Sequence, residues 1–98
     1  MIRAICFDND PAEFYRRKLP GSFLTEPPDE DGEILFRYFC PSGSGHEGVL
    51  VVGNRFKPEG PGPTWHWNGS TSAATLNPSV NHVGHWHGWL RGGYWESV

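Results

Sequence analysis

Short runs rich in apolar, β-branched and aromatic residues recur along the chain between polar and glycine-rich segments, and they predict strands. The clearest is Glu33–Phe39 (EILFRYF), and the apolar run 49–52 (VLVV) follows it. Between the two lies the Gly- and Ser-rich segment 41–48, which is typical of a turn. Two such runs joined by turn residues indicate a β-hairpin, which we predict over residues 34–52.

Shorter strands are predicted in the second half of the chain. Segment 64–68 (TWHWN) alternates and ends at Asn68-Gly69, a strong turn signal. Segment 75–80 (TLNPSV) is interrupted by Pro78, so it is expected to be an edge strand or an irregular strand. In this segment Thr75 and Ser79 can bond backbone groups, which suggests a structural role.

The two ends of the chain complete the pattern. Residues 2–7 (IRAICF) predict a first strand, and 86–95 predicts a final hairpin around Arg91-Gly92-Gly93. The one helix signal lies between residues 10 and 20. Asp10 can cap this helix, Pro11 suits its first position and Glu13 completes a capping box.

These elements predict a mainly β fold with a minor α+β character: a small antiparallel sheet of hairpins with one short N-terminal helix. Thirteen Gly and nine Pro in 98 residues agree with many turns, and the length suggests one domain over residues 1–98. The net charge of −3 argues against nucleic-acid binding. The sequence contains neither a long apolar run nor a signal peptide, so we expect a cytoplasmic protein without a membrane partner.

Metal binding is the first chemistry that the sequence suggests. Cys40 and His46 flank a glycine-rich turn (CPSGSGH), and His85 and His87 are two residues apart. On a strand, residues two apart point to the same face, so both imidazoles could reach one ion. A zinc site of Cys40, His46, His85 and His87 is one hypothesis, and structural histidines without metal are the alternative, because paired cysteines are absent.

Other chemistry has weaker signals. Cys40 with His46 or His87 as base could form a thiol pair, but nothing beside Cys40 marks it as reactive, and no catalytic residue is assigned. The chain has five Trp, and most are expected in the core, with Trp86 and Trp95 paired across the last hairpin. If exposed, tryptophans would form a binding surface, for which the candidates are Trp65, Trp67 and Trp86.

Four segments occur in the order CPSGSGH, GPTWHWNG, ATLNPSV and WHGWLRGG. Their order and spacing resemble the domain of unknown function 6527 family over about residues 36–96. The resemblance implies a phage or prophage origin or a place beside bacterial ubiquitin-like conjugation operons, and it implies metal binding. Cys40 and His87 fall on family ligands, whereas Ser42, Ser44 and Gly84 stand where cysteines are expected. Either His46 and His85 replace the lost thiolates, or the metal has been lost.

Three functions follow as hypotheses. The first is a non-enzymatic binding or adaptor protein of a bacterial host cell, with a structural zinc or a relic of one and a protein as partner. The second is a metal- or thiol-dependent hydrolase acting on a small substrate or a ubiquitin-like conjugate. The third is a phage inhibitor that binds a host protein through an exposed tryptophan surface. The sequence leaves the oligomeric state open.

Overall fold

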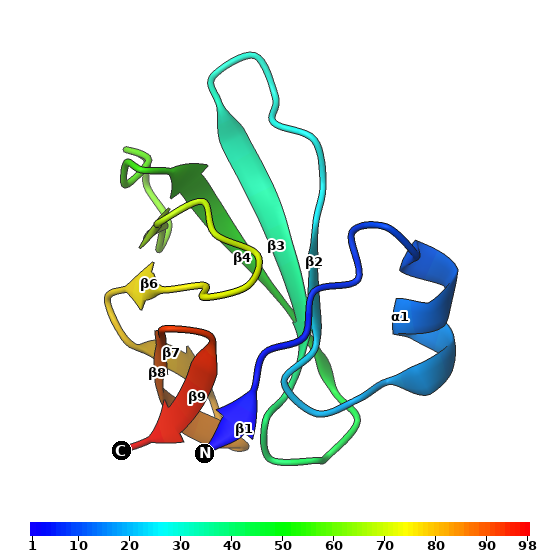
Figure 1. The fold of residues 1–98 in the computed structure, drawn as a ribbon. Helices are drawn as coiled ribbons and strands as arrows, with labels where there is room; N and C mark the ends of the chain where they lie inside the picture. Colours follow the sequence, from blue (N-terminus) through cyan, green and yellow to red (C-terminus); the bar gives the residue numbers. More distant parts are fainter.

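A computed structural model describes residues 1–98 and shows two β-sheets with one helix at their side (Figure 1). The mainly β fold with one short N-terminal helix is therefore confirmed. In chain order the elements are β1 (Ile2–Arg3), α1 (Pro11–Arg17), β2 (Phe23–Thr25), β3 (Glu33–Phe39), β4 (Glu47–Asn54), β5 (Trp65–Trp67), β6 (Leu76–Asn77), β7 (Val80–His82), β8 (Trp86–Arg91) and β9 (Tyr94–Ser97).

The larger sheet has the strand order β2-β3-β4-β5-β6. Its centre is the predicted hairpin, in which β3 and β4 are antiparallel over their full common length, from Glu33 opposite Gly53 to Phe39 opposite Glu47. β5 joins β4 in parallel, and β6 joins β5 antiparallel. The strand β2 was not predicted, because its three residues lack an alternating pattern long enough to stand out.

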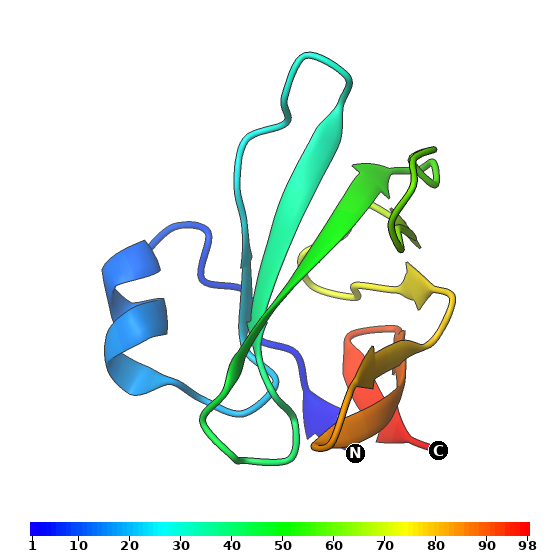
Figure 2. The same ribbon diagram turned by 180° about the vertical axis from the view of Figure 1, so that it is seen from behind.

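The smaller sheet has the strand order β1-β9-β8-β7, and it contains both ends of the chain, which lie close together in Figures 1 and 2. The predicted final hairpin is confirmed as β8 and β9, with Arg91 opposite Tyr94. Its two-residue turn needs positive φ at both positions, and Gly92 and Gly93 have φ values of 56° and 89°. β7 pairs only with β8 and is an edge strand.

Residues from both sheets form one core cluster. Phe23 and Phe36 stack with ring centroids 4.6 Å apart, and Val52, Leu76 and Leu90 are fully buried beside them. On β9, the 1% exposed Trp95 meets Trp86 edge to face at 5.5 Å, so the predicted tryptophan pair is confirmed. This shared core fixes the position of the β7–β8–β9 sheet relative to the larger sheet.

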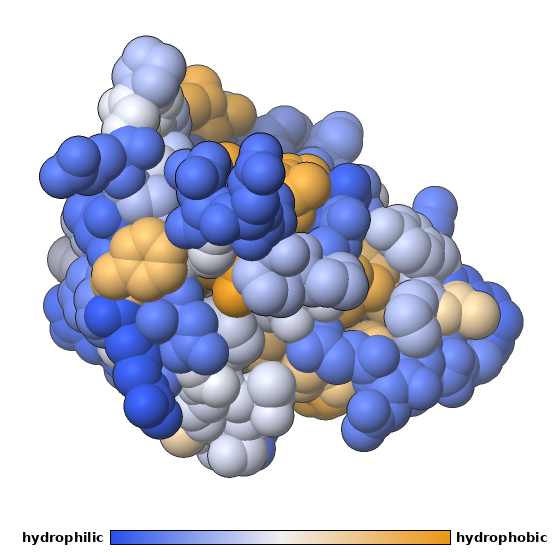
Figure 3. Space-filling view, turned by 90° about the horizontal axis from the view of Figure 1, so that it is seen from above, coloured by the Kyte–Doolittle hydropathy of each residue, from blue (hydrophilic) through white to orange (hydrophobic).

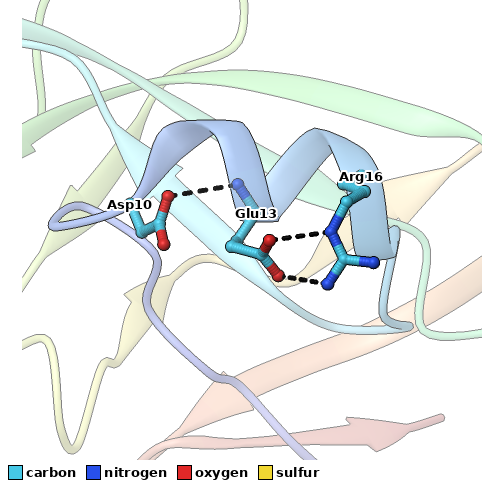
Figure 4. A network of polar contacts seen from close by, with 3 residues as sticks. All are labelled: Asp10, Glu13 and Arg16. Carbon is cyan, nitrogen blue, oxygen red and sulfur yellow. Dashed lines mark hydrogen bonds and ion pairs between the residues drawn. The ribbon is translucent and has the colours of Figure 1, made fainter.

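The helix α1 begins as predicted, but its capping box is incomplete. The side chain of Asp10 accepts a hydrogen bond from the Glu13 amide at 3.3 Å (Figure 4). The carboxylate of Glu13 pairs with Arg16 at 2.7 and 2.5 Å, and the Asp10 amide donates to the carbonyl of Phe7 instead. Only half of the predicted box forms, because a charged partner one turn away outcompetes a backbone amide. Phe14 of this helix joins Leu24 and Phe39 in a second small cluster.

Two predicted strands are shorter or more irregular than their apolar content indicates. Of residues 2–7, only Ile2 and Arg3 pair as a strand, and Cys6 forms a single bridge to Phe23. Segment 75–80 is divided at Pro78 into β6 and the start of β7, and the Asn77–Pro78 bond is cis. The prediction of an irregular strand at this place is confirmed, and the break separates two strands that belong to different sheets.

The surface seen from above is mainly hydrophilic, with apolar residues in separate patches (Figure 3). No helix is long and apolar enough to cross a membrane, since α1 has only seven residues.

Candidate functional site

Ser79 and His87 lie on the outer face of the small sheet. Val80, the first residue of β7, is fully buried, so its strand neighbour Asn81 points outward. Ser79 directly precedes β7, and the contact of its Oγ atom with His87 places its side chain on this outer face. Across the ladder Asn81 is opposite His87, and Val80 is opposite Gly88. The imidazole of His87 therefore lies on the same outer face as Ser79, diagonally across the strand pair.

A hydroxyl and an imidazole meet at this point. The Oγ atom of Ser79 lies 3.3 Å from Nε2 of His87, and the hydroxyl can donate to this nitrogen when it is unprotonated. A nucleophile and its general base must lie within hydrogen-bond reach of each other, and the distance between their two atoms is often somewhat longer without a substrate. His87 is exposed and Ser79 is half-buried, so a substrate can approach both groups from solvent.

The surroundings hold Ser79 by its backbone. The indole Nε1 of Trp65 donates to the carbonyl oxygen of Ser79 at 3.1 Å, which ties the start of β7 to β5 of the other sheet.

The three ion pairs of the structure involve Arg16 and Arg37 with glutamates, and none includes His87. The arrangement is thus a Ser–His pair without a carboxylate partner for the histidine.

The four predicted metal ligands do not all meet. His46 and His85 lie side by side, with ring centroids 4.2 Å apart. Cys40 is fully buried with its Sγ atom 3.1 Å from Oγ of Ser42, and His87 contacts Ser79. No three or more His, Cys, Asp or Glu residues are placed so that they could hold a metal ion. Zinc binding at these residues stays a prediction.

The spacing argument for His85 and His87 fails for a structural reason. β8 begins at Trp86, and His85 lies before it in the turn, where its amide donates to the carbonyl of His82. A residue outside the strand does not follow the alternation of faces. His85 therefore turns toward His46, whereas His87 lies on the outer face beside Ser79.

His82 joins His46 and His85 in a cluster of three histidines. Its ring centroid lies 5.0 Å from that of His85 and 6.4 Å from that of His46. Its Nδ1 atom is 3.3 Å from the hydroxyl of Tyr38. Burial lowers the pKa of His82, and the neighbouring His85 and His46 lower it further, so the neutral ring is favoured.

The candidate binding-surface tryptophans differ in exposure. Trp67 is only 5% exposed and packs edge to face on Phe36, so it lies in the core, where most of the tryptophans were expected. Trp65 and Trp86 are half-buried and pack against the core. The indole rings of these three tryptophans pack in or against the core, which leaves little of their area for a partner.

The model of one family, described as "Bacterial ubiquitination-like system serine protease (BubE)", matches residues 9–98. The chain belongs to this family. The BubE match supports the association with bacterial ubiquitin-like operons that the sequence resemblance implied, and it carries no statement about metal. No curated protein and no solved structure shows significant similarity to the chain.

The Ser–His pair is the feature that the sequence analysis missed. His87 was considered as a metal ligand, and Ser79 was interpreted as bonding backbone groups, as Thr75 does when its Oγ1 accepts from the Gly92 amide at 2.9 Å. A signal was present, because Ser79 directly precedes β7 and His87 lies on the strand that pairs with β7, so the short hairpin brings the two residues together. Recognising it required the register of β7, which a three-residue strand does not reveal.

Proposed function

We propose that this protein is a serine peptidase of a bacterial ubiquitination-like system, with Ser79 as nucleophile and His87 as general base. The distance of 3.3 Å between Ser79 Oγ and His87 Nε2 on an exposed sheet face is the observation that supports the proposal. The description of the BubE family names the same class of reaction. The partners of this chain would be proteins, namely ubiquitin-like proteins or their conjugates.

The first half of the reaction forms an ester. Nε2 of His87 takes the hydroxyl proton as Oγ of Ser79 attacks the carbonyl carbon of the scissile bond. The C–N bond then breaks, and His87 gives this proton to the leaving amine. The acyl group stays on Ser79, and the amine product is released.

The second half restores the enzyme. His87 takes a proton from water, whose oxygen attacks the ester carbonyl on Ser79. The ester C–O bond breaks, the proton returns to Oγ and a free carboxylate leaves. The two half-reactions need no co-reactant other than water. Their products, an amine and a carboxylate, are those of ordinary peptide hydrolysis.

A phosphorus probe tests the proposal without knowledge of the natural substrate. An alkyl fluorophosphonate forms a stable bond with an activated serine oxygen and releases fluoride. We expect one phosphonyl group per chain, located at Ser79 by tandem mass spectrometry, and no labelling of Ser79→Ala. Ser97→Ala, which removes an exposed serine of β9, should label normally. Absence of labelling, or labelling of another serine, would contradict the proposal.

A thiol-dependent mechanism makes the opposite prediction. Burial raises the pKa of Cys6 to about 11, and Cys40 is fully buried against Ser42. Because the thiolate is the nucleophile, iodoacetamide at pH 8 should alkylate the folded protein on the order of 10² times more slowly than the unfolded protein. Alkylation followed by mass spectrometry gives both rates. Rapid alkylation that also stops hydrolysis would favour the thiol enzyme.

The adaptor and inhibitor hypotheses are separated by the same fluorophosphonate experiment. A binding module has no reason to activate a serine hydroxyl, so both hypotheses predict an unreacted chain. A peptidase predicts stoichiometric modification at Ser79. The proposed function thus takes the hydrolase alternative of the sequence analysis and replaces its metal or thiol with a hydroxyl.

A further inference from the structure

The edge of β7 beside Ser79 has unpaired backbone groups. The sheet order β1-β9-β8-β7 leaves one side of β7 without a neighbouring strand, and Asn81 in its middle is exposed. An unpaired edge can accept the backbone of another chain as an additional strand. The question is which groups of β7 are free to do so.

The hydrogen-bond register answers it. The Val98 amide donates to the carbonyl of His87 at 3.0 Å, so the backbone groups of His87 point toward β9. In an antiparallel ladder successive residues alternate, and Trp86 and Gly88 therefore point toward β7. Asn81, opposite His87, forms a pair without ladder bonds. Its N–H and C=O are directed away from β8, toward the open edge.

One end of this edge is closed and the other is open. Ser79 directly precedes β7, and its carbonyl already accepts from the indole of Trp65, so this group is not free to pair. The open part begins at Asn81, two residues or roughly 7 Å along the strand from Ser79. A chain paired with Asn81 would thus pass within a peptide unit or two of the nucleophile.

We infer that an extended tail of a protein substrate adds to the β7 edge, pairs with the backbone N–H and C=O of Asn81, and thereby brings its scissile bond to Ser79. This inference rests on the proposed function and specifies its substrate class. Only a segment with free backbone groups can make these bonds, so a flexible chain end fits and a helix or a strand within a folded sheet does not. The backbone bonds give binding without strong dependence on side chains.

Two phosphorus probes test the inference. One is a small alkyl fluorophosphonate, which has no peptide backbone, and the other is a diphenyl phosphonate bearing acetyl-Ala-Ala-Ala-Gly. The ratio of their rates of reaction with Ser79 measures what the backbone contributes. A third probe, identical to the second but with N-methylated amides, cannot donate to the edge. We expect N-methylation to lower the ratio roughly tenfold, the effect of one or two backbone hydrogen bonds.

A protein variant tests the same contact from the other side. Asn81→Pro removes the free N–H and no ladder bond, since this N–H faces away from β8. It should lower the ratio roughly tenfold, whereas Asn81→Ala keeps the backbone and should keep the ratio. Because each ratio is measured on one variant, a disturbance of the Ser–His pair cancels.

The outcomes are distinct. A ratio that responds neither to N-methylation nor to Asn81→Pro would overturn the inference while the small probe still supports the peptidase. Failure of both probes to label Ser79 would overturn the proposed function itself. A dimer in size-exclusion chromatography that Asn81→Pro converts to a monomer would assign the edge to a second copy of the chain and would also overturn the inference.

Discussion

Replacing His87 with alanine lowers the rate at which a fluorophosphonate reacts with Ser79 by roughly 10²- to 10⁴-fold, the usual contribution of a positioned general base. The reason is the contact of 3.3 Å between Nε2 of His87 and Oγ of Ser79. Ser79 is the hydrogen-bond partner of the His87 side chain. The rate is measured by quenching the labelling reaction at successive times and recording the intact mass of the protein. Removing an exposed ring should change stability by less than about 0.5 kcal/mol, so the loss is not one of folding.

His46→Ala is the matched control for this result, because it removes an exposed histidine from the β3–β4 turn without touching the pair. Its labelling rate should equal that of the unmodified chain. Two results would count against His87 as the base. One is an unchanged rate in His87→Ala, and the other is an equal loss in His46→Ala, which would point to the histidine cluster instead.

Much of the fold could be predicted because the long strands carry their own signals. Glu33–Phe39 was predicted residue for residue, since a run of aliphatic and aromatic residues bounded by turn residues is typical of a strand. The hairpin β8–β9 was visible through Gly92 and Gly93. β2 was not predicted and β7 was predicted only at its first residue, because a strand of three residues acquires its register from neighbours that are distant in sequence.

The candidate site was less predictable for the same reason. A pairing such as Ser79 with His87 depends on the register between β7 and β8, and a shift of one residue would place a different residue of β8 beside Ser79. His85 and His87 were expected on one face because strand alternation was extended to His85, although the predicted hairpin and β8 both begin at Trp86. Boundaries of elements are thus the weak point, and here a boundary separated two chemical hypotheses.

Replacing Trp95 with alanine lowers the free energy of unfolding by about 3 to 5 kcal/mol, the range for deletion of a large buried aromatic ring. The ring is 1% exposed and lies 5.3 Å from the ring of Tyr38 on β3. Its Nε1 donates to the carbonyl of Gly21 at 2.8 Å, so the truncation also leaves a buried acceptor without its donor. The whole free energy of unfolding of a chain of this size is about 5 to 15 kcal/mol. The melting temperature of Trp95→Ala should therefore fall by roughly 15 to 30 °C.

Trp89→Ala is the control on the same hairpin. Trp89 is half-buried on the outer face, where Arg91 lies 4.5 Å from its ring centroid, and its loss should cost about 1 kcal/mol or less. Trp95→Phe should fall between the two, because it keeps most of the ring volume and loses the donor to Gly21. Urea denaturation followed by circular dichroism gives all three values. Equal losses for Trp95→Ala and Trp89→Ala would contradict the role of Trp95 in holding the two sheets together.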